Sequence, residues 1–158
     1  MLNSKLLYTE LEGLIKIKAG RGIVLEAVFE RALKPVAVIK SQLEQVIMNL
    51  VINASQAMPQ GGNLTIGAKN VIFDGSGGDR KGKYICLFVS DTGMGMDEKT
   101  QAHIFEPLFT TKKQGEGTGL GLFVTNHIIR NHGGWINVKS EVGKGTTFEI
   151  YLPASQAR

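Results

Sequence analysis

Glycine occupies every second position in the segment Gly115-Glu-Gly117-Thr-Gly119-Leu-Gly121, and an amphipathic stretch, residues 122–129, follows directly. Residues without a side chain let the backbone approach a ligand closely. The helix that the amphipathic stretch predicts would present unpaired N–H groups and a partial positive charge at its start, which suit a phosphate. The segment is therefore a candidate phosphate-binding loop. Glycine repeats also form flexible hinges, so the rest of the chain has to separate the two interpretations.

A chain of 158 residues is long enough to bury a core and short enough to form one domain. Its hydrophobic fraction of 42% and charged fraction of 20% are those of an ordinary soluble globular protein. The formal net charge of +4 is not concentrated in one tract, which argues against nucleic acid as a partner. The pair Lys112-Lys113 lies beside the glycine loop, where a polyphosphate would explain it.

The single cysteine, Cys86, excludes a disulfide framework and a cysteine zinc site. No apolar run reaches the ~18 residues of a membrane span, and the N-terminus lacks a signal-peptide pattern. We therefore expect a cytoplasmic domain in a reducing compartment that contacts no membrane, within a parent protein that is either soluble or membrane-anchored.

The pattern of apolar residues and glycines predicts strands, a helix, strands, a long loop, a helix and strands, in that order. We expect strands at 23–29, 36–39, 63–73, 83–90, 135–140 and 146–152, helices at 42–58 and 120–131, a helical turn within 97–104, and a partly helical lead-in over 1–20. This order predicts an α+β fold (an α/β sandwich) in which a mixed, mostly antiparallel sheet carries about three helices on one face. The domain proper is expected over 21–158, with a flexible lid at about 96–118, because such long loops are usually functional.

Particular residues predict where the helices begin and end. Ser41 is expected to cap the N-terminus of the first helix, with Glu44 completing a capping box. Pro59 and the glycines after it end that helix. Gly133 is expected to be the C′ residue of the second helix.

Two asparagines, Asn49 and Asn53, lie four residues apart on the first expected helix and so share a face. A carboxamide oxygen is a neutral, hard ligand that suits Mg²⁺, which takes few protein ligands and keeps phosphate oxygens and waters. Asparagine is also a mediocre helix former, so helix propensity does not explain two asparagines in the middle of a helix. The alternative is that Asn49 bridges neighbouring backbone while Asn53 faces solvent.

Asp91 directly follows an apolar strand and is itself followed by Gly93 and Gly95. A carboxylate fixed at a strand end by tight glycine turns can accept a hydrogen bond from an amino group deep in a pocket. Adenine carries such a group at its 6-position and guanine does not. The alternative is an Asx turn, in which Asp91 bonds to the backbone of its own loop.

Five segments of the chain carry a family resemblance. They are Asn49-Leu-Val-Ile-Asn53-Ala54, Asp91-Thr-Gly93-Met-Gly95, Ile104-Phe105-Glu106-Pro107-Leu108-Phe109-Thr110-Thr111-Lys112, Gly117-Thr-Gly119-Leu-Gly121-Leu122 and Gly143-Lys-Gly145-Thr-Thr-Phe148. In this order they resemble the N, G1, F, G2 and G3 boxes of the ATP-binding catalytic domain of sensor histidine kinases. That domain belongs to the superfamily of gyrase-type topoisomerases, Hsp90 and mismatch-repair clamps. The resemblance runs from about Ser41 to Pro153 and implies the Bergerat-type α/β sandwich.

The resemblance implies a role for each matching residue. Asn53 resembles the Mg²⁺ ligand, and Asn49, one turn earlier, lines the phosphate side. Asp91 resembles the carboxylate that reads adenine, with Gly93 and Gly95 shaping the floor of its pocket. Lys112 resembles a lid contact to the terminal phosphates, which makes it a catalytic candidate with the two asparagines. The remaining ATP-binding candidates are Phe105 and Phe109 at the aromatic hinge of the lid and Gly117, Thr118, Gly119, Leu120, Gly121 and Leu122 in the glycine loop.

The chain departs from the family pattern in two places. Many members carry a basic residue and then a tyrosine shortly after the second asparagine, where this chain has Gln56 and Ala57, a pair familiar from the nitrogen-regulation-like branch. The other departure is the phospho-acceptor, because His103, His127 and His132 all lie outside the His-Glu context that precedes the asparagine helix in the family. We expect all three to be structural, with His132 near a helix end, where a cation is favoured. The chain thus resembles an excised catalytic module.

The hydrolysing members of the superfamily place a glutamate four residues before the magnesium asparagine as a general base. Here that residue is Asn49, which cannot take a proton at neutral pH, and Glu44 is nine residues from Asn53 and faces elsewhere. We therefore expect slow attack by water, and the leading hypothesis is transfer of the γ-phosphate of ATP to a histidine on the dimerisation domain of the same parent protein. A serine/threonine kinase of the anti-sigma-factor type and a nucleotide-gated interaction module without chemistry are the alternatives.

The resemblance also implies the ligands and partners. ATP and Mg²⁺ are the expected ligands, the histidine-bearing dimerisation domain is the expected direct partner, and a response regulator acts downstream. The isolated domain is expected to be monomeric.

Overall fold

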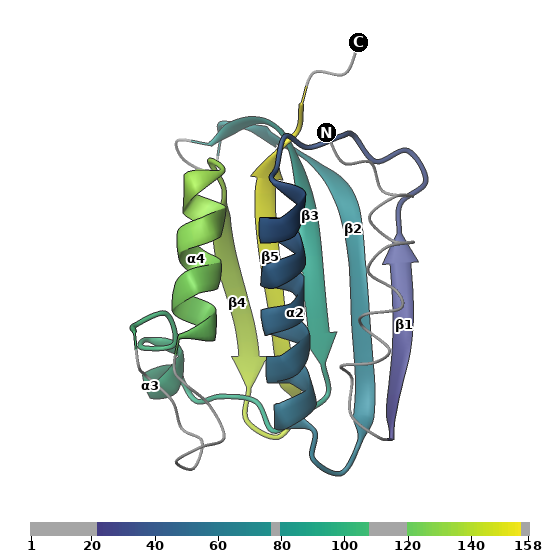
Figure 1. The fold of residues 1–158 in the computed structure, drawn as a ribbon, viewed down its shortest axis with the longest axis vertical. Coiled ribbons are helices and arrows are strands. Elements are labelled where there is room, and N and C mark those ends of the chain that lie inside the picture. Colours follow the sequence, from purple (N-terminus) through teal and green to yellow (C-terminus); the bar gives the residue numbers. More distant parts are fainter. Residues whose placement is uncertain (1–21, 77–79, 108–119, 156–158) are drawn as a thin grey trace.

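The computed structural model describes residues 22–76, 80–107 and 120–155. A five-stranded sheet runs through them in the order β1-β2-β3-β5-β4 (Figure 1). Its strands are β1 (Ile23–Phe29), β2 (Gly62–Asp74), β3 (Lys81–Asp91), β4 (Trp135–Glu141) and β5 (Gly145–Pro153). The helices are α2 (Lys40–Ala57), α3 (Glu98–Gln101) and α4 (Gly121–Asn131). Within these described ranges, no helix has both the length and the hydropathy that crossing a bilayer requires.

The sheet is mixed, as the sequence predicts. β1 runs parallel to β2, whereas the β2–β3, β3–β5 and β5–β4 pairs are antiparallel. The strand expected at 36–39 is wrong, because only Val36 pairs, in an isolated bridge to Ala154. Its neighbour Pro35 accepts a bond from the Ser155 N–H at 2.8 Å but has no N–H to donate, so a regular ladder cannot continue there.

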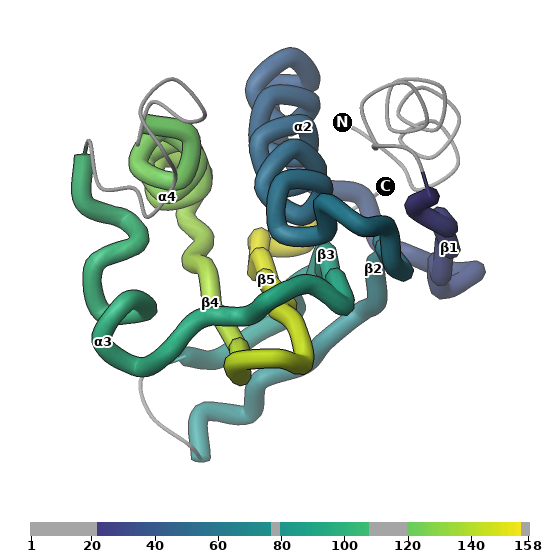
Figure 2. Tube along the Cα trace, turned by 90° about the horizontal axis from the view of Figure 1, so that it is seen from below, coloured from purple at the N-terminus to yellow at the C-terminus, as the bar shows by residue number. Residues whose placement is uncertain are grey.

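Both long helices pack on the same face of the sheet, as Figure 2 shows from below. Side chains alternate between the two faces of a strand, so Ile85, Leu87 and Val89 of β3 all point into the layer beneath the helices, where they are buried. On α2, the apolar positions at helical spacing are buried against them: Leu43, Val46, Ile47, Leu50, Val51 and Ala54. This confirms the expected two-layer α+β architecture.

Helix α2 begins earlier than expected. Lys40 is its first residue and Ile39 its N-cap, with no side chain bonded to the cap. Ser41 is therefore inside the helix, and the N-cap and capping box expected for Ser41 and Glu44 are wrong. The physical reason lies elsewhere in the fold, because Nε2 of His132 accepts a hydrogen bond from the Ile39 N–H at 3.3 Å and ties this helix start to the end of α4.

The other helix ends follow local sequence rules. Helix α4 ends in a Schellman motif, in which Gly133 has a φ of 79° and the N–H groups of Gly133 and Gly134 donate to Arg130 and Ile129 at 3.1 and 3.0 Å. The expected C′ role of Gly133 is therefore confirmed. The helical turn expected within 97–104 is α3, and Asp97 caps it by accepting from the Thr100 N–H at 2.7 Å.

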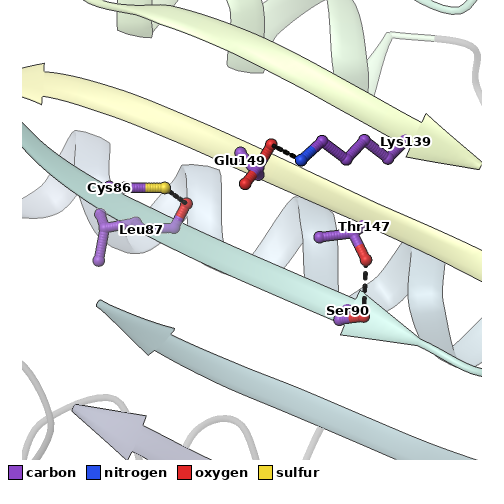
Figure 3. A network of polar contacts seen from close by, with 6 residues as sticks. All are labelled: Cys86, Leu87, Ser90, Lys139, Thr147 and Glu149. Atoms are coloured by element: carbon purple, nitrogen blue, oxygen red, sulfur yellow. Dashed lines mark hydrogen bonds and ion pairs between the residues drawn. The ribbon is translucent and has the colours of Figure 1, made fainter. Parts of the chain in front are cut away.

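The sheet face opposite α2 and α4 carries polar contacts between strands (Figure 3). The Lys139 ammonium lies 3.2 Å from Oε1 of the buried Glu149, and the hydroxyls of Ser90 and Thr147 are 2.7 Å apart. Cys86 is fully buried on this face, and burial raises the pKa of its thiol. These contacts join β3 and β4 to β5 and so help to fix the position of the C-terminal end of β3. The candidate site lies at that end.

Candidate functional site

The C-terminal half of α2 lies between the start of α4 and the loop after β3, at one end of the sheet (Figure 1). On one side, Asn49 bonds to the first residue of α4. At the end of the helix, the Ala57 carbonyl accepts a bond from the Met94 N–H at 3.1 Å. Three segments that are far apart in the sequence therefore meet along two turns of one helix.

Asn49 is fixed by α4. Its Nδ2 donates to the Gly121 carbonyl at 3.2 Å and to the Thr125 hydroxyl at 3.3 Å. The bridge to neighbouring backbone that was the alternative for Asn49 is therefore present, across two helices. One carboxamide nitrogen can make this bridge while its oxygen takes part in binding, so the contact does not conflict with a site role.

Asn53 lies one turn further along α2, on the same face, with a half-buried side chain. Its carboxamide oxygen is a neutral oxygen ligand of the kind that Mg²⁺ accepts beside phosphate oxygens and waters. Among the described residues, no three His, Cys, Asp or Glu side chains gather into a metal cluster. A metal ion bound at this part of α2 would therefore depend on Asn53 as a protein ligand. Its other ligands would be phosphate oxygens and waters.

Asp91 ends β3 with its carboxylate buried beneath the layer of helices, only 8% exposed. Oδ1 accepts the Gly93 N–H at 2.8 Å, so the Asx turn considered for this residue is formed. Burial raises the pKa of the Asp91 carboxyl, and backbone hydrogen bonds from Gly93 and Thr146 lower it, with burial the larger effect. A buried carboxylate of this kind is stabilised by any further hydrogen-bond donor that a ligand brings.

The glycines of this loop allow backbones to touch. A Cβ on Gly93 would stand 2.8 Å from the Ala57 Cβ, and a Cβ on Gly95, whose φ is 71°, would overlap the Glu141 carbonyl. Gly93 therefore allows the loop to pack against the end of α2, and Gly95 allows it to pack against the β4–β5 turn. The expectation that the same glycines shape the floor of a pocket remains a prediction.

Helix α4 starts at the glycine loop. Leu120 is its N-cap, and no side chain bonds to the cap. The first N–H groups of any helix have no partner within the helix, and here they include those of Gly121, Leu122 and Phe123, because the Val124 N–H is the first to donate back, to the Leu120 carbonyl. This start lies beside Asn49 and combines backbone donors that have no partner within the helix with the positive end of the helix dipole.

Of the segment expected to form a lid, at about 96–118, the structure describes residues 96–107. Phe105 is half-buried and packs against the core next to the buried Ile104. Near it, Gln101 donates to the Met96 and Ser140 carbonyls at 2.9 and 3.2 Å, which fastens the first part of the segment to β4. Five candidates lie outside the described residues, namely Phe109, Lys112, Gly117, Thr118 and Gly119.

The remaining titratable candidates lie away from Asn53. Glu44 pairs with Lys40 at 3.9 Å, near the opposite end of α2. His103 bonds to Glu106 on the exposed surface, and His127 is exposed on α4. His132 lies at a helix end, as expected, and its Nε2 accepts a hydrogen bond from the Ile39 N–H at 3.3 Å.

Sequence reasoning missed Thr125. This residue is fully buried on α4, and its hydroxyl lies between Asn49 and the Gly121 carbonyl. The available signal was weak: a β-branched residue with a hydroxyl in mid-helix, four residues after the last glycine of the loop. The partner Asn49 is 76 positions away, so no local pattern points to the contact.

With this geometry in view, a family profile described as "Histidine kinase-, DNA gyrase B-, and HSP90-like ATPase" matches residues 39–156. The chain belongs to this family. It is 42% identical over 149 residues to the sensor kinase CckA of Brucella abortus and 41% identical over 133 residues to the sensor histidine kinase ZraS of Salmonella typhi. These alignments cover 91% and 84% of the chain but only 16% and 26% of the relatives, so the chain spans a small part of their length.

Solved structures agree on the fold. Full-length ShkA in complex with AMPPNP is 25% identical and superposes with a TM-score of 0.80, covering 99% of this chain and 31% of that one. The catalytic domain of the histidine kinase ThkA is 27% identical with a TM-score of 0.71, covering 95% of this chain and 89% of that one. The expected histidine kinase ATPase fold is therefore confirmed.

Proposed function

We propose that this chain binds Mg²⁺-ATP and supplies the γ-phosphate that is transferred to a histidine on the dimerisation domain of its parent sensor kinase. One observation carries the proposal: α2 brings Asn49 and Asn53 between the buried Asp91 and the start of α4. The residue proposed to read adenine, the proposed metal ligand and the helix start proposed to bind phosphate would thereby all lie beside the C-terminal half of α2. The bound AMPPNP in the ShkA structure, an ATP analogue, supports a nucleotide as the ligand of this fold.

Asp91 is the residue that we propose to read adenine. Its carboxylate is buried at the end of β3 and holds one Asx bond to Gly93, which fixes its direction. The 6-amino group of adenine would donate to it, and guanine, with a carbonyl at that position, would not. Selectivity for ATP over GTP follows from this single residue.

The phosphates belong at the other end of the site. The N–H groups at the start of α4 and the positive end of its dipole favour the charged oxygens. Asn53 would hold Mg²⁺, which neutralises phosphate charge when bound. Lys112 and the glycine-loop residues Gly117, Thr118 and Gly119 are proposed to close over the terminal phosphates, as the resemblance implies.

The absence of a carboxylate at position 49 favours transfer over hydrolysis. Asn49 cannot take a proton from water at neutral pH, and its Nδ2 is already bonded to α4. Glu44, the acidic residue of α2, pairs with Lys40 one turn earlier and lies nine residues from Asn53. Phosphoryl transfer needs chiefly positioning and neutralisation of charge, and an imidazole from the dimerisation domain would be the nucleophile.

The named relatives support partners of the same kind. Sensor kinases such as ZraS and CckA imply a phospho-acceptor domain in the parent protein and a response regulator downstream. Because ATP is the substrate, we expect the domain to work in the cytoplasm.

The test follows label from γ-labelled ATP with Mg²⁺, with and without the parent protein's phospho-acceptor region. Acid-labile label on that region, with little free phosphate from the domain alone, is the expected result. Acid-stable label on a protein hydroxyl would instead establish a serine/threonine kinase. Nucleotide binding without any transfer would leave a nucleotide-gated interaction module, and rapid release of phosphate by the domain alone would contradict the role given to Asn49.

A further inference from the structure

We propose that Thr125 is a positioning residue that fixes the carboxamide of Asn49 with its nitrogen toward α4 and its oxygen toward the nucleotide. The inference rests on the proposed function, because it concerns how the phosphate side of that site is prepared. It adds a residue that lies outside the five sequence motifs.

The Thr125 hydroxyl has a defined direction. The side chain is fully buried, and Oγ1 donates its only proton to the Gly121 carbonyl at 2.8 Å. What Thr125 offers to Asn49, at 3.3 Å, is therefore an oxygen lone pair. The Gly121 carbonyl, 3.2 Å from the same Asn49 nitrogen, is also an acceptor.

Two acceptors facing one carboxamide decide its orientation. If Asn49 turned by half a rotation, its oxygen would face the Gly121 carbonyl and the Thr125 hydroxyl oxygen, with no proton between them. The nitrogen must therefore face α4, and Oδ1 is left as the atom that Asn49 offers to the site. Thr125 therefore fixes the orientation of the Asn49 side chain before a nucleotide binds. This reduces the side-chain entropy that is lost on binding.

The same acceptor pair selects an amide over a carboxylate at position 49. The carboxylate oxygens of an ionised aspartate there would face the Gly121 carbonyl and the Thr125 hydroxyl oxygen, which are both acceptors, in a half-buried environment. The Thr125 hydroxyl could donate to the carboxylate only by giving up its hydrogen bond to the Gly121 carbonyl. This gives a local physical reason for a carboxamide at position 49. Thr125 thereby takes part in the choice between transfer and hydrolysis.

A buried helical threonine commonly bonds to the carbonyl four residues earlier, and a purely structural role would stop at that bond. Such a role predicts lower stability when the hydroxyl is removed, and an equal change in affinity for every nucleotide. The positioning role predicts that recognition of the terminal phosphate changes selectively. The two roles are separated by comparing a nucleotide that has a third phosphate with one that lacks it.

The experiment measures the affinity of the chain for Mg²⁺-AMPPNP and for Mg²⁺-ADP by calorimetry. Thr125→Val keeps the shape and removes the hydroxyl, and Thr125→Ser restores it. We expect Thr125→Val to bind AMPPNP about three- to tenfold more weakly, the size of one neutral hydrogen bond, with ADP affinity within about twofold and Thr125→Ser close to wild type. Thr147→Val, which removes a hydroxyl bonded to Ser90 on the opposite sheet face, is the matched control and should leave both affinities unchanged.

Equal affinities in Thr125→Val and wild type, or equal losses for both nucleotides, would overturn the positioning role while leaving the proposed function intact. A wild-type chain that binds neither nucleotide would overturn the proposed function and this inference with it. Asn49→Asp provides a second test that needs no nucleotide and no Thr125 variant. Relative to wild type, its urea midpoint should fall more at pH 7 than at pH 4, because only the protonated carboxyl can donate to the acceptor pair; a loss independent of pH would overturn the inference.

Discussion

The acid–base chemistry of Asp91 depends on its burial at the end of β3. Its carboxyl pKa is raised above the ordinary value of 3.8 because burial disfavours the charged form more than the Gly93 and Thr146 backbone bonds favour it. In the free domain, this group therefore contributes stability below pH 3.8 that is lost as the pH rises through its folded pKa. A ligand amino group would favour the charged form, so nucleotide binding is expected to depend on pH in the opposite sense.

We predict that ATP affinity falls on acidification at a higher pH than an ordinary aspartate would give, because protonated Asp91 loses the charge that attracts the 6-amino group. Asp91→Ala should weaken binding about tenfold to a hundredfold, the value of a hydrogen bond to a charged group of about 1.5–3 kcal/mol. Calorimetric titrations between pH 4 and 8 measure both effects.

Asp91→Asn is the control for the pH dependence, because its amide does not titrate while ATP itself titrates equally with both proteins. The difference in affinity between wild type and this variant should shrink toward acidic pH. A difference that is constant over the whole range would contradict the assignment of Asp91 as the adenine reader.

At the scale of the elements, the loop after β3 is held by close backbone contacts on two sides. Gly93 allows it to pack on the end of α2, and Gly95 on the β4–β5 turn, where the Gly143 N–H donates to the Met94 carbonyl at 2.7 Å. The position of the loop after β3 therefore depends on its contact with the β4–β5 turn.

Gly95→Ala and Gly143→Ala make a matched pair for this contact. Both glycines have a positive φ, 71° and 82°, which costs an alanine about 1–3 kcal/mol, but a Cβ on Gly143 meets nothing within 4 Å whereas a Cβ on Gly95 overlaps the Glu141 carbonyl. We predict that Gly95→Ala lowers the free energy of unfolding in urea by more than Gly143→Ala does. Equal losses would mean that the loop can move off the turn.

The two long helices are joined at the end far from the site by His132. Its ring accepts the Ile39 N–H through Nε2 at 3.3 Å, and Nδ1 lies 2.8 Å from the Ile128 carbonyl, to which it donates. One imidazole therefore links the start of α2 to the last turn of α4. This contact takes the place of the side-chain cap that α2 lacks.

We predict that His132→Ala lowers the free energy of unfolding by about 0.5–1.5 kcal/mol, because the Ile39 N–H loses its partner. His127→Ala is the control on the same helix, since His127 is exposed and should change stability by less than about 0.5 kcal/mol. Urea denaturation at pH 7.5 measures both, and equal effects would argue against the link.

For the molecule as a whole, the candidate site is formed by segments from most of the described chain. β3 ends at Asp91, α2 carries both asparagines, and α4 supplies a helix start, all at one end of a two-layer fold. Unfolding separates these segments, so a ligand of the site binds only the folded state.

We therefore predict that Mg²⁺-ATP at about a hundred times its Kd stabilises the chain by about 2.7 kcal/mol, which raises Tm by about 5–10 °C. Removal of Mg²⁺ with a chelator should reduce this shift, and Asn53→Ala should make the remaining shift insensitive to the chelator. Mg²⁺ without nucleotide is the control and should leave Tm unchanged. A chelator effect of equal size in Asn53→Ala and wild type would exclude Asn53 as the metal ligand.

Local patterns were sufficient to predict most of the elements. The spacing of apolar residues identified α2 and α4, and glycines marked the end of α4 and the turns. The order of the elements predicted the mixed sheet beneath the helices. These signals could be read from the sequence because each depends on neighbouring residues. The motif residues were also readable as a candidate site, whose roles stay predictions until binding is measured. Local rules failed at Ser41 and at 36–39, where a distant partner or a proline decided the outcome.

The tertiary structure alone decided which way the site residues face. Asn49 meets Gly121 and Thr125 across 72 and 76 positions of sequence, and His132 meets Ile39 across 93. Contacts of this kind form only when two helices pack on one sheet, so no window of sequence contains both partners. The chain's sequence determined which fold it adopts and which residues its site can draw on; packing determined the direction of each hydrogen bond, because a donor and an acceptor must be brought together before either has an orientation.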